Sequence, residues 1–147
     1  MTPRLLPFLV LLSLLLVACD TRAIEVEDAW GQPSVPGAAN SAFYMTLTNR
    51  SGVDDTLLAA SSASCRAMEL HETQVDDRGA VQMRPLARGI PLPAGETVAL
   101  TVDGRHVMCV GVAESLLVGD HVALTLEFAQ ADPVTVRATI LTEPPAG

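Results

Sequence analysis

The sequence predicts an all-β fold, an antiparallel Greek-key β-sandwich or barrel. No segment keeps a helical period for long, and short β-type runs are instead separated by Gly, Pro, Asp and Asn. The clearest run, Ser41 to Asn49, places Phe43, Met45 and Leu47 on one face. About seven to nine short strands at this spacing are typical of a sandwich rather than of a helical or α/β domain.

The other predicted strands are recognised by the turn signals beside them. A Pro/Gly/Ser-rich loop at 31–40 separates the first strand from the second, and Asp103-Gly104 is a strong hairpin signal. Further turns are predicted at 77–79, 93–95, 119–120 and 132–133. The predicted strands are 24–30, 41–49, 68–73, 81–84, 97–102, 106–112, 122–128 and 134–141. They make a single domain over residues 24–142, followed by a flexible tail at 143–147.

The N-terminus has the pattern of an export signal. Arg4 precedes an apolar run from Leu5 to Ala18, and these 14 residues are shorter than the roughly 20 needed to span a bilayer. The run ends in Leu-Val-Ala-Cys, which resembles the bacterial lipobox, so Cys19 is the expected lipidation site. Residues 1–18 are then a lipoprotein signal peptide and 19–23 a short lipidated tether. An ordinary signal peptide with an incidental Cys19 is the alternative.

The charge of the chain excludes several partners and reactions. After removal of the signal peptide, 8 Arg stand against 17 acidic residues, a formal charge of −9, and the sequence contains no Lys. Without a basic patch to bind phosphates, nucleic acid is not an expected partner. Lysine Schiff-base chemistry is excluded as well. An acidic surface is compatible with attracting cations, but it is equally typical of an ordinary soluble exported domain, so it indicates no particular function.

Met and His residues cluster in the middle of the chain. Met68, His71, Met83, His106 and Met108 fall within one short stretch. Thioether sulfur prefers Cu(I) and imidazole suits several first-row metals, so a mixed set favours copper. His106 and Met108 are two residues apart on a predicted strand and therefore leave the same face. We expect these two, with His71 and Met83, to meet at one pole as a neutral site of two nitrogens and two sulfurs. Alternation favours the core for Met68, and a role in supporting the ligands is the alternative.

The residues around His71 do not indicate a hydrolase. His71-Glu72 begins like a zincin motif, but Val75 stands where the second His is needed, and no Gly-x-Ser-x-Gly elbow occurs. We therefore expect no enzymatic activity. Glu69 and Glu72 flank His71; solvated charges are the default expectation, and orientation of an imidazole is the functional alternative.

Cys65 and Cys109 are the two cysteines of the domain. An oxidising, exported location favours a disulfide between them, which would contribute about 4 kcal/mol by closing its loop. Free thiols and additional Cu(I) ligands are the alternatives. Strand alternation argues against a ligand role for Cys109, because it points away from Met108.

These residues resemble the periplasmic copper chaperone (PCuAC) family of Cu(I)-binding proteins. The likeness extends from Asp28-Ala29-Trp30 to Phe128 and includes the segments 42–49, 68–72, 83–86 and 106–108. The family ligand pattern of His, then Met, then His-x-Met falls on His71, Met83, His106 and Met108. Between them lie 11 and 22 residues, and turn insertions would absorb the small excess over the family spacing.

The resemblance implies a cupredoxin-like domain that carries one Cu(I) in the periplasm. The implied partners are copper-accepting proteins, namely the copper centres of cytochrome c oxidase or Sco-type proteins. Lipidation at Cys19, followed by Asp20, implies a membrane anchor, expected at the inner membrane facing the periplasm. Two alternatives stay open: a blue-copper-like electron-transfer protein, and a copper-buffering or structural lipoprotein without a dedicated client.

Overall fold

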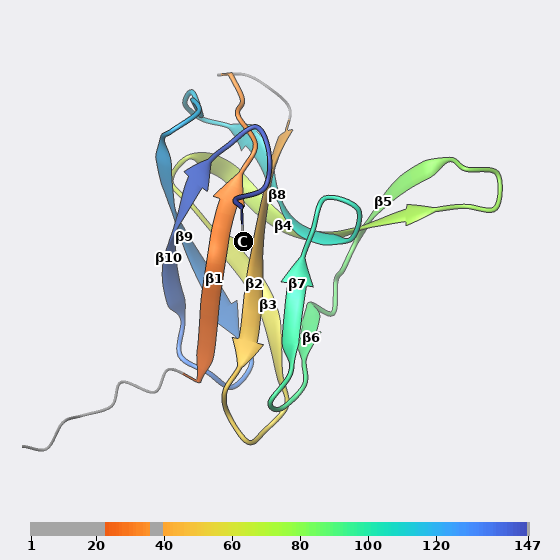
Figure 1. The fold of residues 1–147 in the computed structure, drawn as a ribbon, viewed down its shortest axis with the longest axis vertical. Helices are drawn as coiled ribbons and strands as arrows, with labels where there is room; N and C mark the ends of the chain where they lie inside the picture. The colour runs from red at the N-terminus through yellow and green to blue at the C-terminus, as the bar shows by residue number, and fades with distance from the viewer. Residues whose placement is uncertain (1–22, 36–39, 147) are drawn as a thin grey trace, which may run out of the picture.

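The computed structural model describes residues 23–35 and 40–146. Within this part the chain forms ten strands and no helix, so the all-β prediction is confirmed (Figure 1). The strands are β1 (Ile24–Gly31), β2 (Asn40–Asn49), β3 (Asp55–Ser61), β4 (Cys65–Val75), β5 (Val81–Pro85), β6 (Ile90–Leu92), β7 (Thr97–Leu100), β8 (Arg105–Val112), β9 (His121–Phe128) and β10 (Val134–Ile140).

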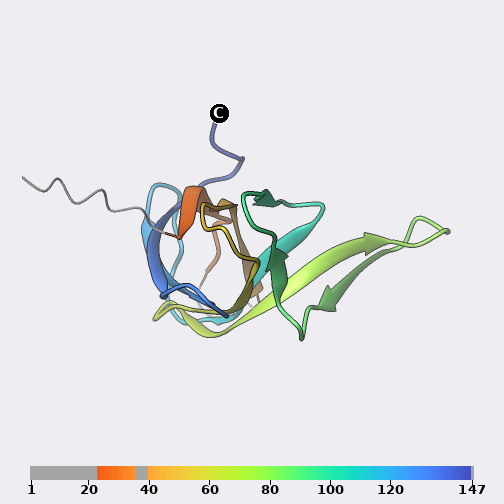
Figure 2. The ribbon, with the colours of Figure 1, turned by 90° about the horizontal axis from the view of Figure 1, so that it is seen from below.

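The strands form one continuous path that curls on itself around a core (Figure 2). Their order is β5-β4-β8-β2-β1-β10-β9-β3-β6, and β7 pairs with β2. The pair β1/β10 is parallel, with Trp30 opposite Thr139, so the expectation of a strictly antiparallel sheet is wrong at this pair. These are the first and last strands, and no hairpin connects them and requires an antiparallel arrangement.

The core lies between the inward faces of the strands. Phe43, Leu47, Val107 and Leu124 are fully buried there. The alternation predicted for β2 is present, but both faces of this strand are covered. Its second face carries a smaller apolar cluster of Trp30, Ala42 and Tyr44, with Leu141 packed against it.

One hairpin leaves the body of the sandwich. β4 is longer than predicted, and its second half pairs with β5 to form a projection that we call the arm, residues 72–84 (Figures 1 and 2). The arm contains several exposed large apolar side chains, namely Val75, Val81 and Met83. It is the part of the hairpin farthest from the core.

The predicted N-terminal features fall outside the described residues. The signal segment 1–18, Cys19 and most of the tether at 19–23 belong to the part that the structure does not describe. In the described part, no helix is long and apolar enough to cross a bilayer. Residues 143–146 of the predicted tail follow β10 without forming a strand.

Candidate metal centre

The pairing of β5, β4 and β8 places all four predicted ligands on one face. His71 on β4 lies directly opposite His106 on β8. Met108 follows His106 by two residues and therefore points to the same side. Met83 on β5 lies opposite Thr73, which follows His71 by two residues and shares its face. His71 is thus the central member of the set.

The two imidazole rings are close enough to share one ion. Their centroids are 6.0 Å apart and their planes are nearly perpendicular, at 79°. A metal–imidazole bond is about 2 Å long for a first-row ion such as zinc, so one ion can be bound by both rings at this separation. His106 is almost completely buried, and the side chain of His71 is 14% exposed.

Each imidazole has one nitrogen engaged and one free. His106 Nδ1 lies 3.1 Å from the carbonyl oxygen of Gly104, which can only accept, so this nitrogen carries the proton and donates it. His71 Nε2 lies 2.9 Å from Glu69 Oε2 and donates to that carboxylate. Among the described residues, the buried side-chain nitrogens and oxygens without a hydrogen-bond partner are His71 Nδ1 and His106 Nε2. Two buried lone pairs without partners are what a metal site of this type requires.

Burial also keeps His106 in the form that binds metals. Desolvation lowers the pKa of the His106 imidazole below its usual value; the hydrogen bond to Gly104 opposes this shift, and the nearby His71 adds to it. A neutral ring retains the lone pair on Nε2 near neutral pH, and neutral imidazole is the metal-binding form.

The structure places His71, His106 and Met108 side by side on β4 and β8, whereas the fourth predicted ligand, Met83, lies on the neighbouring β5. Met108 is buried beside His106, with 6% of its surface exposed. Met83 is 54% exposed and belongs to the arm. It is the diagonal neighbour of His71 across the β4/β5 pair, and such neighbours lie about 7–8 Å apart at Cα, within reach of long side chains. Met83 can therefore join the site by its own side-chain rotation or by a bend of the arm.

Two aromatic residues, Trp30 and Tyr44, pack next to His106. A bulge in β1 between Glu27 and Trp30 brings Trp30 opposite Tyr44 on β2. The rings of Trp30 and Tyr44 are 4.6 Å apart, and the ring of Tyr44 is 6.1 Å from that of His106. Burial, with a smaller contribution from Asp103, raises the pKa of Tyr44, so the phenol stays neutral. Alternation in β2 points Tyr44 toward the His106 face, but the bulge that adds Trp30 has no clear sequence signal.

The two cysteines face away from the ligands. Cys65 and Cys109 are joined by a disulfide, with their Cα atoms 5.5 Å apart. Both belong to the buried core, and Cys109 alternates with His106 and Met108 along β8. Neither sulfur is available as a thiolate ligand in this form.

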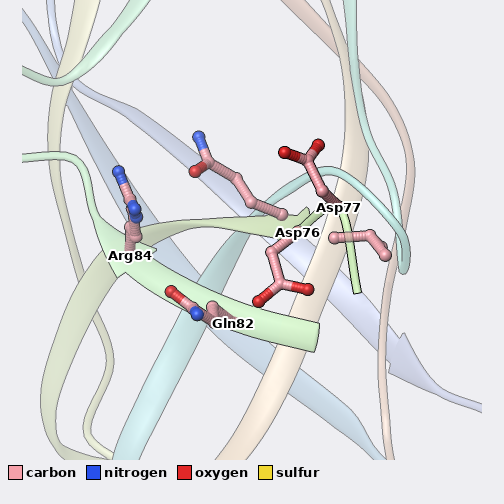
Figure 3. A pocket seen from close by; sticks show the side chains of 6 residues that line it. Asp76, Asp77, Gln82 and Arg84 are labelled. Atoms are coloured by element: carbon pink, nitrogen blue, oxygen red, sulfur yellow. The ribbon is translucent and has the colours of Figure 1, made fainter. Parts of the chain in front are cut away.

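A cavity on the arm is separate from the ligand set. Its volume is about 220 Å³, and none of the four predicted ligands lines it (Figure 3). Asp76 on its wall has a structural task, because its Oδ1 atom accepts hydrogen bonds from the amides of Arg78 and Ala80 and so closes the turn of the arm. The lining residues are Gln74, Val75, Asp76, Asp77, Gln82 and Arg84.

Comparison with solved structures shows that this fold is similar to that of copper-binding domains. The copper-bound PCuAC domain from PmoF2 has a TM-score of 0.66 and 27% identity, over 84% of this chain and 94% of that one. The solution structure of CuI-DR1885 from Deinococcus radiodurans has a TM-score of 0.58 and 28% identity, over 83% and 82%. The PCuAC resemblance and the cupredoxin-like fold are therefore confirmed.

Sequence comparison gives the family. The "Putative lipoprotein Lxx21020" of Leifsonia xyli subsp. xyli is 30% identical over 115 residues, which are 77% of this chain and 68% of that protein. The family model described as "Putative lipoprotein LpqE-like" matches residues 24–140, nearly the whole described domain. The chain belongs to this LpqE-like family of lipoproteins, whose domain here has the PCuAC fold.

Proposed function

We propose that this protein is an extracytoplasmic Cu(I) chaperone that binds one ion through His71, His106, Met108 and Met83. The observation that carries the proposal is the pair of buried, unpartnered nitrogens, His71 Nδ1 and His106 Nε2, on rings 6.0 Å apart. Copper-bound relatives with the same fold support it. A set of neutral nitrogen and thioether ligands matches the softness of Cu(I).

The uneven burial of the ligands suggests how the ion is released. His106 and Met108 are buried, whereas Met83 is more than half exposed. An accepting protein can therefore displace Met83 first and take over the ion by stepwise ligand exchange. We propose that the acceptor is a copper protein such as cytochrome c oxidase or a Sco-type protein.

Measurement of Cu(I) binding tests the proposal. Competition with a colorimetric Cu(I) chelator should give one tight site per chain, which His71→Ala and His106→Ala abolish. His121→Ala is the matched control, because His121 is exposed, lies on β9 opposite Thr139 of β10, and belongs to a strand that does not pair with β4, β5 or β8. Equal copper binding by all four proteins would refute the assignment.

A transfer assay separates a chaperone from a copper buffer. The copper-loaded protein should pass Cu(I) to an apo copper domain faster than a Cu(I)–chelator complex does at the same free-copper concentration. If the protein binds Cu(I) but does not transfer it, the delivery role fails and the protein is a copper-buffering lipoprotein. The electron-transfer alternative is less favoured, because blue-copper sites use a cysteine thiolate and the two cysteines of the described domain form a disulfide.

We also propose that Cys19 carries a lipid anchor that holds the domain at the periplasmic face of the inner membrane. The lipoprotein family supports an anchored protein, and more than one acyl chain gives stable attachment. Cys19→Ala should convert the protein from the membrane to the soluble fraction of fractionated cells. Retention of the variant in the membrane fraction would contradict the anchor.

A further inference from the structure

We infer that Glu69 is a positioning residue, which holds the ring of His71 so that Nδ1, and not Nε2, binds the copper ion. The inference deepens the proposed copper function and rests on it. The carboxylate would act on the ion only through the imidazole: it fixes the site of the proton and the orientation of the ring.

The register explains why Glu69 can do this. It precedes His71 by two residues on β4 and lies opposite Met108 on β8. Glu69, His71, His106 and Met108 therefore form two adjacent cross-strand pairs on one face. The carboxylate is on the site's own surface, 2.9 Å from Nε2 of the ring, and 52% of its side chain remains exposed.

The two imidazoles are held through different ring nitrogens by different partners. The carbonyl of Gly104 holds Nδ1 of His106 and leaves Nε2 for a metal. Glu69 holds Nε2 of His71 and leaves Nδ1. Without Glu69, the ring of His71 could turn and satisfy its buried Nδ1 elsewhere, because an unpaired buried acceptor is unfavourable. The hydrogen bond to the carboxylate keeps that free nitrogen in place.

A direct ligand role for Glu69 fits less well than the positioning role. Carboxylate oxygen is a hard donor and suits Mg, Ca or Mn better than Cu(I). Within residues 23–35 and 40–146, no three His, Cys, Asp or Glu side chains are grouped to hold a metal. A carboxylate that accepts from the second nitrogen of a metal-binding imidazole is instead a recurrent arrangement, and its loss typically lowers metal affinity about 10–100-fold.

The neighbouring Glu72 provides a matched control. It flanks His71 on the other side along the chain, but alternation points it to the opposite face, where it accepts from Arg105 and Gln74. The two glutamates thus differ in the face they occupy. A general effect of negative charge near His71 would appear in variants of both.

The test reads the His71 ring in the apo protein and then the copper affinity. Long-range ¹⁵N NMR should show His71 as a single Nε2–H tautomer with NOEs to the ring of His106. Glu69→Ala should give mixed tautomers, lose those NOEs and lower Cu(I) affinity about 10–100-fold. Glu69→Gln, which retains an acceptor oxygen, should restore the tautomer, and Glu72→Ala should change neither readout. The His106 signals report an intact fold in every variant.

The two claims can fail separately. If Glu69→Ala leaves the tautomer, the NOEs and the affinity unchanged, the positioning role is overturned while the copper function stands. If the wild-type chain binds no Cu(I), the copper function is overturned, and the apo spectra still decide whether Glu69 orients His71. Loss of affinity in Glu72→Ala equal to that in Glu69→Ala would also overturn positioning, because it would indicate a charge effect.

Discussion

Reduction of the Cys65–Cys109 disulfide should destabilise the domain without removing the copper site. The bridge joins residues 44 positions apart, and the chain-entropy relation gives about 4 kcal/mol of stabilisation for a loop of this length at 25 °C. For a domain of this size, that loss corresponds to a fall in Tm of about 15 °C. The ligands should keep their places, because His106 and Met108 leave β8 on the face opposite Cys109.

Urea unfolding of the oxidised and reduced protein measures the change in free energy. The Cys65→Ala/Cys109→Ala double variant is the control, since a reductant should not alter its stability. Cu(I) stoichiometry is determined on the same samples, and it should remain one per chain in the oxidised protein and in the double variant. A change below about 1 kcal/mol would refute the entropic argument. Loss of the copper site in the double variant would refute the assignment of the two faces.

Three further predictions concern single side chains. Met108→Leu should lower Cu(I) affinity at least about tenfold, and Met83→Leu should lower it less, because water can replace the exposed thioether but not the buried one. Competition with a chelator measures both affinities, and a larger loss in Met83→Leu would contradict the prediction. Copper binding should change the emission of Trp30, the single Trp of the chain, through its contact with Tyr44; an unchanged spectrum at saturation would argue against a site beside this aromatic pair. Asp55→Asn should cost about 2 kcal/mol at neutral pH. Burial acts to raise the pKa of Asp55, but hydrogen bonds from backbone amides lower it overall. The wild type therefore loses this contribution as pH falls below about 4. In urea unfolding, the free energy of unfolding of the variant should depend less on pH in this acidic range than that of the wild type.

Much of the fold could be predicted because β-strands follow a period of two between turn residues. The strands that were missed show where this signal ends. β3 (Asp55–Ser61) begins with Asp and contains two Ala, residues that are depleted in strands. β6 (Ile90–Leu92) is three residues long and contains Pro91, which argues against a strand and is tolerated here at the edge of the sheet. Tertiary pairing with neighbours, and not local preference, makes these two segments extended.

In the candidate site, too, local pattern fixes some relations between residues and tertiary pairing fixes the others. Alternation alone puts His106 and Met108 on one face and Cys109 on the other, and this local relation holds in the structure. The position of His71 opposite His106 depends on the register of β4 against β8, which no local pattern specifies. Once His71 is placed there, alternation within β4 puts Glu69 on the same face and Glu72 on the other.

The states of the two imidazoles could not be derived from the sequence at all. Whether a His is a ligand or a satisfied surface residue depends on which of its nitrogens finds a partner, and that is a property of three-dimensional contacts. Here the backbone carbonyl of Gly104 and the carboxylate of Glu69 each engage one nitrogen and leave the other buried and free. A fold selected only for stability would satisfy those two nitrogens or replace the rings with apolar side chains, since each unpaired buried group costs about 1–3 kcal/mol. The two unpartnered nitrogens are therefore the strongest support for the proposed copper site.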